Sequence, residues 1–164
     1  MHSFFSGVRP GLMLSICQEN IKQEIANAKF VSVIADETTD ISSTCQLVVV
    51  FRYVLNGLQP VERFWQFINP PGHNAASISQ CIIQSLLESG VNKDKIISQS
   101  YDGANVMTSG KHGGVQTIIK EQYKYAYFVH CYAHQLNFII AQCTSQNHQV
   151  RIFFSNLSDI TNFF

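Results

Sequence analysis

Phe30-Val-Ser-Val-Ile-Ala35 is a short apolar run rich in β-branched residues, and the polar segment Asp36-Glu-Thr-Thr-Asp40 follows it directly. An apolar run of this length predicts a buried strand rather than a helix, and the polar residues predict a turn at its end. Asp36 therefore falls at the carboxyl end of a buried strand, which is where α/β proteins place their sites.

The segments around this strand predict the rest of a sheet. Residues 46–54 and 62–67 alternate like strands and flank Asn56-Gly57, a strong hairpin signal, so they are expected to pair antiparallel. Residues 95–100 and 127–129 predict two further strands joined through helices, a connection that requires parallel neighbours. The fold class is therefore α/β, with a mixed five-stranded sheet flanked by helices. Apolar residues at helical spacing predict those helices at 12–28, 78–87, 115–123, 136–143 and 152–164.

Length and composition indicate one globular domain. The chain has 164 residues, of which 46% are hydrophobic, which excludes an intrinsically disordered chain. Basic and acidic residues number 11 each, so the basic excess of a self-sufficient nucleic-acid binder is missing. No apolar run approaches the ~20 residues that span a bilayer, so no membrane partner is expected. Five scattered cysteines, an odd number, indicate reduced intracellular thiols.

Two aspartates are the candidate metal ligands. Asp102 follows the fourth predicted strand as Asp36 follows the first, so the two carboxylates meet at one sheet edge if these strands are neighbours. Hard cations such as Mg²⁺ or Mn²⁺ prefer carboxylate oxygens. The alternative is structural: Asp36 forms an Asx-turn, and Asp102-Gly103 forms a tight turn. The nearby acids Glu37 and Asp40 are expected to be surface or capping groups.

Cys131 and His134 have the spacing of metal ligands, but a structural zinc ion needs four. No second close Cys/His pair is present in the sequence, so these two residues do not predict an independent zinc site. Taken alone they predict a buried thiol and a hydrogen-bonded histidine where a strand meets a helix.

Three ordered segments resemble one protein family. Ala28-Lys-Phe-Val-Ser-Val-Ile-Ala-Asp-Glu-Thr-Thr-Asp40 resembles the first catalytic segment of hAT-superfamily transposases, especially the zinc-finger MYM-type 1-like group. Ser100-Tyr-Asp-Gly-Ala-Asn-Val-Met107, with Gly110-Lys-His-Gly-Gly-Val115, resembles their second acidic segment. His130-Cys-Tyr-Ala-His-Gln-Leu-Asn137 resembles a later segment that carries a Cys-x-x-His motif.

The resemblance implies a ribonuclease-H-like fold and metal-dependent cleavage and joining of DNA strands in the nucleus. In that family two aspartates and a glutamate hold the divalent metal, Mg²⁺ or Mn²⁺, and Asp36 and Asp102 match the two aspartates. Cys131 and His134 would flank the active site and help to position DNA. The family's glutamate lies on a late helix beyond an all-helical insertion, and no match for it is found before residue 164.

The resemblance also predicts the domain limits: an N-terminal amphipathic helix region at 1–29, a partial ribonuclease-H-like core at 30–150 and the start of the helical insertion at 151–164. With two carboxylates and no third, the chain is expected to be inactive alone, and its apolar C-terminal segment favours self-association. The alternative function is non-enzymatic: a domesticated module that binds proteins or chromatin.

Overall fold

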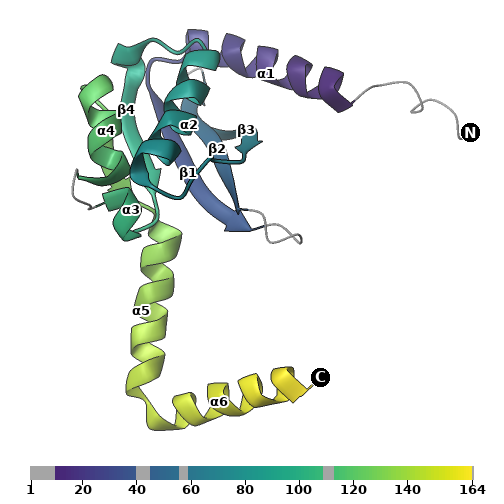
Figure 1. The fold of residues 1–164 in the computed structure, drawn as a ribbon, viewed down its shortest axis with the longest axis vertical. Helices are drawn as coiled ribbons and strands as arrows, with labels where there is room; N and C mark the ends of the chain where they lie inside the picture. Colours follow the sequence, from purple (N-terminus) through teal and green to yellow (C-terminus); the bar gives the residue numbers. More distant parts are fainter. Residues whose placement is uncertain (1–9, 40–44, 56–58, 109–112, 164) are drawn as a thin grey trace, which may run out of the picture. The chain divides into compact units, whose positions relative to one another are not determined.

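Figure 1 shows the chain in a computed structural model that describes residues 10–39, 45–55, 59–108 and 113–163. The Asn56-Gly57 turn, Asp40 and residues 110–112 lie outside the described residues. The chain divides into two compact units, Met1–Val129 and His130–Phe164, and each is described by itself. The domain limits expected from the sequence stay predictions.

The sheet has five strands in the order β3-β2-β1-β4-β5. Strand β1 pairs antiparallel with β2 and parallel with β4, and β2 pairs antiparallel with β3. This topology confirms the predicted α/β fold, with the first strand at the centre, the hairpin on one side and the parallel strand on the other. The strands are β1 (Val31–Thr39), β2 (Cys45–Leu55), β3 (Gln59–Ile68), β4 (Ile96–Tyr101) and β5 (Tyr127–His130).

Strand β1 does not end at Ala35 as the sequence predicted. Its polar residues stay in the sheet because β2 pairs with them, from Asp36 opposite Val48 to Thr39 opposite Cys45. Pairing with β2 satisfies the backbone of Asp36 and Glu37 despite their low strand propensity, and Thr38 and Thr39 favour strands themselves. The predicted turn at Asp36 is therefore wrong.

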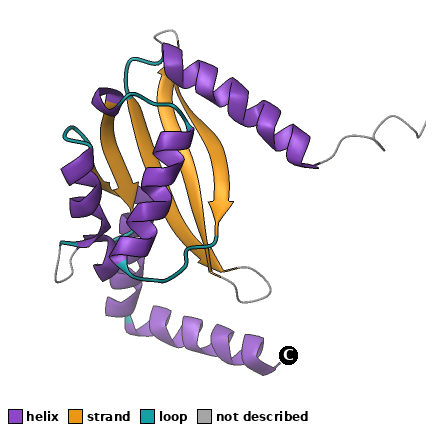
Figure 2. Cartoon of the chain, turned by 45° about the horizontal axis from the view of Figure 1, so that its top comes forward, coloured by secondary structure: helices purple, strands orange, loops and turns teal. Residues whose placement is uncertain are grey.

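The helices of the first unit pack on one face of the sheet (Figure 2). Asn74 starts α2 because its side chain accepts a hydrogen bond from the backbone N–H of Ser77 at 2.9 Å. The helix then buries Ile78, Ile82 and Leu86, which recur every four residues and share one helix face. The helical elements of this unit are α1 (Pro10–Asn27), α2 (Ala75–Glu88), the short 3-10 helix η1 (Lys93–Lys95), α3 (Asn105–Thr108) and α4 (Gly114–Gln122).

The core lies between these helices and alternate residues of the central strands. On β1 the buried positions are Val31, Val33 and Ala35, which point to the same face because strand side chains alternate. Phe51 on β2 and Trp65 on β3 pack together there, with ring centroids 5.5 Å apart. The alternation leaves the opposite face of β1 for Ile34 and Asp36.

The second unit consists of α5 (Tyr132–Gln146) and α6 (His148–Phe163). Both helices begin earlier than the apolar spacing predicted. None of the helices in the described part of the chain is long and apolar enough to cross a membrane. Large apolar side chains of this unit that are exposed include Leu136, Phe138, Ile139, Ile140, Ile152, Phe153, Phe154 and Leu157.

Candidate functional site

The two candidate metal ligands are Asp36 on β1 and Asp102, the residue directly after β4. Their parallel register pairs Ile34 with Ser100, and Asp36 and Asp102 follow two residues later on each segment. The two aspartates therefore lie toward the carboxyl ends of adjacent parallel strands. Asp36 is exposed and Asp102 is half-buried. That their side chains share one cation stays a prediction.

Asp102 has a local structural role as well. Its Oδ1 accepts a hydrogen bond from the backbone N–H of Ala104 at 3.3 Å, which is the geometry of an Asx-turn just after β4. The tight-turn interpretation is thus correct for Asp102, in contrast to Asp36. A carboxylate has two oxygens and about four lone-pair sites, so this hydrogen bond leaves acceptor capacity for a cation.

As a donor set, two carboxylates fit the oxygen preference of Mg²⁺ and Mn²⁺, which take their remaining ligands from water and substrate phosphates. Among the residues that the structure describes, neither Asp36 nor Asp102 belongs to a group of three or more Asp, Glu, His or Cys ligand atoms within 4.8 Å of one another. Among the described residues, no further carboxylate therefore joins the two aspartates in such a group.

The sheet face that carries Asp36 is rich in exposed aromatic side chains. Asp36 pairs with Val48, and Val48 pairs with Phe67 on the next strand. Phe67 contacts Phe64 with ring centroids 4.9 Å apart, and these side chains are 58% and 46% exposed. The helices of the first unit, which pack on the other face, leave these two rings in contact with solvent.

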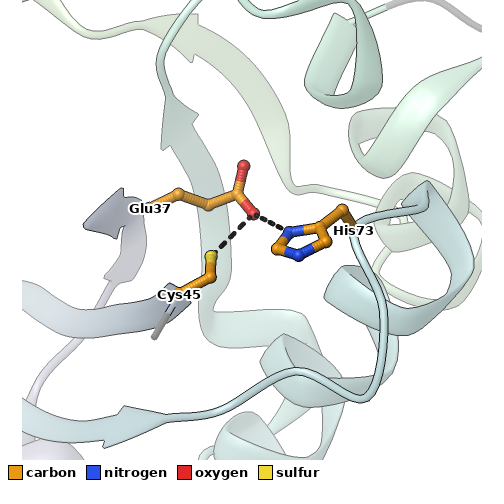
Figure 3. Close-up of side chains that lie close together, drawn as sticks. All are labelled: Glu37, Cys45 and His73. Atoms are coloured by element: carbon orange, nitrogen blue, oxygen red, sulfur yellow. Dashed lines mark hydrogen bonds and ion pairs between the residues drawn. The ribbon is translucent and has the colours of Figure 1, made fainter. Parts of the chain in front are cut away.

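A second cluster lies on the opposite side of β1, where Glu37 meets Cys45 and His73 (Figure 3). The Cys45 thiol donates to Glu37 Oε1 at 3.7 Å, and His73 Nδ1 lies 3.8 Å from the same oxygen. Burial, together with the charge of Glu37, raises the pKa of the Cys45 thiol. Sequence reasoning assigned Glu37 to the surface and gave no role to Cys45 or His73.

Cys131 and His134 lie in the second unit, at the start of α5. Cys131 is the N-cap residue and is only partly buried, which corrects the expected buried thiol. Hydrogen bonds with His134, chiefly with its side chain and also with its backbone, lower the pKa of the Cys131 thiol. The two residues thus contact each other where β5 meets α5. Their role in positioning DNA stays a prediction.

One comparison with known proteins identifies a family. The model of the ZMYM1/FAM200, RNase-like domain (DUF4371) matches residues 13–113, which is more than half of the chain. The matched region includes most of helix α1, strands β1 to β4 and both Asp36 and Asp102. It ends before Cys131 and His134.

Proposed function

The chain belongs to the ZMYM1/FAM200 RNase-like domain family, and from this membership we propose that it is part of the catalytic core of a hAT-type transposase-like protein. The parent reaction is metal-dependent cleavage and transfer of DNA strands, which takes place in the nucleus. One observation carries the proposal: Asp36 and Asp102 follow paired positions of adjacent parallel strands within the matched region.

Asp36 and Asp102 are the proposed ligands of Mg²⁺ or Mn²⁺. When bound, such an ion polarises a phosphodiester and stabilises the charge on the attacking and leaving oxygens. The contribution of the protein is to hold two carboxylates on the rigid end of the sheet, so that little reorganisation is needed when DNA phosphate arrives. Cys131 and His134 are proposed to lie near the DNA.

We propose that this chain does not cleave DNA by itself. No third acidic residue joins Asp36 and Asp102 in a ligand group among the described residues. The net charge of zero also provides no general attraction to the phosphate backbone. DNA binding by this chain should therefore depend on the bound metal more than on basic side chains.

The proposal is tested by fluorescence anisotropy of a labelled DNA duplex, measured with Mn²⁺ and with EDTA. Mn²⁺ should raise the affinity of the wild type for DNA several-fold and should leave the Asp36→Asn/Asp102→Asn double variant unchanged. The Asp94→Asn variant is the control because Asp94 is an exposed residue of η1. Equal DNA affinity of the wild type in Mn²⁺ and in EDTA would overturn the proposal.

A second function, association with another protein, is supported by the surface of the second unit. Helices α5 and α6 contain one arginine and one aspartate as their charged residues, so they offer a single cationic side chain to DNA phosphate. Their exposed apolar side chains, such as Phe138 and Phe153 at 65% and 60%, suit a protein contact instead.

Sedimentation velocity tests whether the protein bound by the second unit is another copy of this chain. If the second unit mediates self-association, the wild type should sediment as an oligomer, and the Phe138→Ser/Phe153→Ser variant should sediment as a monomer. A wild type that sediments as a monomer at all concentrations would remove self-association from the account, without affecting the metal hypothesis.

A further inference from the structure

We propose that Glu37, Cys45 and His73 form a binding site for Zn²⁺ or a similar transition-metal ion, separate from the Asp36/Asp102 pair. Oε1 of Glu37 lies 3.7 Å from Sγ of Cys45 and 3.8 Å from Nδ1 of His73. One ligand atom from each of the three residues lies within 4.8 Å of the other two. Figure 3 shows the thiol and the imidazole on either side of the Glu37 carboxylate.

Three separate segments of the first unit build this cluster. Glu37 lies near the end of β1 and pairs with the buried Leu47 of β2. Cys45 is the first residue of β2, two residues before Leu47, so the side chains of Glu37 and Cys45 lie on the same face of the sheet. His73 comes from the loop after β3 and directly precedes Asn74, the residue that caps α2. The ends of two strands and a helix cap thus fix the three backbones.

The distances are close to those of a tetrahedral zinc site. With zinc–ligand bonds of about 2.0–2.3 Å, neighbouring ligand atoms in a tetrahedron lie about 3.4–3.6 Å apart. The observed separations are 3.7 Å between sulfur and oxygen and 3.8 Å between nitrogen and oxygen. Small side-chain rotations are sufficient to close this difference, and His73 can make them because its side chain is 75% exposed.

The donor set selects the kind of metal. A thiolate, an imidazole and a carboxylate suit Zn²⁺ and related transition metals, whereas Mg²⁺ prefers oxygen ligands alone. Three protein ligands leave a fourth tetrahedral position for water, and the exposed side of His73 gives an ion access from solvent. This arrangement is typical of zinc sites that keep an open coordination position.

Metal binding at this cluster changes the protonation of Cys45. The Cys45 thiol donates to a Glu37 carboxylate oxygen at 3.7 Å. Binding of a divalent cation replaces the thiol proton, so each ion bound by Cys45 releases one proton to solvent.

This site does not depend on the proposed function. Asp36 and Glu37 are consecutive on β1, so their side chains point to opposite faces of the sheet. Loss of the Asp36/Asp102 site should leave the Cys45 cluster intact, and loss of the Cys45 cluster should leave Mn²⁺ binding intact.

Titration with Co²⁺ tests the proposal on the full chain, because a Co²⁺–thiolate bond gives a charge-transfer absorption that carboxylate ligands do not. The wild type should take up one Co²⁺ per chain with this absorption, and Zn²⁺ should remove it by displacing Co²⁺. Cys45→Ser should abolish the absorption, while His73→Gln and Glu37→Gln should each weaken Co²⁺ binding by tenfold or more. Circular dichroism confirms that each variant is folded.

Matched variants show which residues give the Co²⁺–thiolate absorption. Cys17→Ser and His148→Gln change exposed residues outside the cluster and should leave Co²⁺ binding unchanged, as should Asp36→Asn. A wild type without the thiolate absorption would overturn the proposal and make the cluster a hydrogen-bonded ion pair only. The same conclusion follows if Cys131→Ser, rather than Cys45→Ser, removes the absorption.

Discussion

Replacement of Glu24 by glutamine tests what fixes helix α1 to the sheet. The Glu24 carboxylate accepts hydrogen bonds from Tyr53 Oη at 2.7 Å and from Arg63 Nε and Nη2 at 2.8 Å and 3.2 Å. Tyr53 lies on β2 and Arg63 lies on β3, so one side chain on α1 joins the helix to both strands of the hairpin. Glutamine keeps the shape of the side chain and removes its charge.

The size of the stability loss expected for Glu24→Gln follows from the burial of its partner Tyr53. Tyr53 is 2% exposed, and burial raises the pKa of Tyr53, so its hydroxyl stays a donor that needs an acceptor. Hydrogen bonds to a charged group contribute about 1.5–3 kcal/mol each. Solvent screens the ion pair, because the side chains of Arg63 and Glu24 are 38% and 29% exposed. We therefore expect Glu24→Gln to lower the free energy of unfolding by about 1–2 kcal/mol.

The loss of unfolding free energy in Glu24→Gln should depend on pH. The hydrogen bonds from Arg63 lower the pKa of Glu24 below its ordinary value of 4.5, against the opposing effect of burial. A depressed folded-state pKa stabilises the fold above the unfolded value, and this stabilisation is lost as pH falls through the folded value. The difference between wild type and Glu24→Gln should thus be complete at pH 7 and should shrink below about pH 4.5.

Urea unfolding followed by Trp65 fluorescence measures the effect, because Trp65 is the single tryptophan and is 1% exposed. The control is Glu19→Gln on the same helix, since Glu19 forms an ion pair with Lys22 at 3.6 Å and its side chain is 61% exposed. This control should change stability by less than about 0.5 kcal/mol. Equal losses in the two variants, or a Glu24→Gln loss that persists in acid, would refute the reasoning.

Two further perturbations follow from local geometry. Gly113→Ala should lower the free energy of unfolding by about 1–3 kcal/mol, because Gly113 has φ of 85° and a Cβ there would clash with the Thr117 side chain. A thermal melt unchanged from wild type would contradict this. At neutral pH, iodoacetamide should alkylate Cys131 faster than the exposed Cys143, because a hydrogen bond from His134 lowers the pKa of Cys131. His134→Ala should remove the difference, and peptide mass spectrometry that finds equal rates in the wild type would show that the hydrogen bond has no effect.

The sheet could be predicted because its signals are local. The β-branched run before Asp36 and the two alternating segments after it determine three strands, and the helices between the later strands require parallel pairing. What local signals could not show is where β1 ends. Asp36 and Glu37 have low strand propensity, and pairing with β2 keeps them extended together with Thr38 and Thr39.

The same pairing explains why the Glu37 cluster was missed. Glu37, Cys45 and His73 belong to three segments, and no spacing motif connects them. Extension of the hairpin register through Glu37 would have placed it on the same face as Cys45, and this signal was available in the alternation of β2. The position of His73 depends on the loop before α2, which the sequence does not specify.

Isothermal titration with Mn²⁺ tests most directly the central claim, that Asp36 and Asp102 together form one metal site. The account predicts weak binding of Mn²⁺ to the wild type and to Asp94→Asn, and loss of that binding in Asp36→Asn and in Asp102→Asn alike, because each carboxylate supplies ligands that the other cannot replace. Identical heats from all four proteins would contradict the claim and leave Asp102 as the residue of an Asx-turn and Asp36 as an exposed residue of β1.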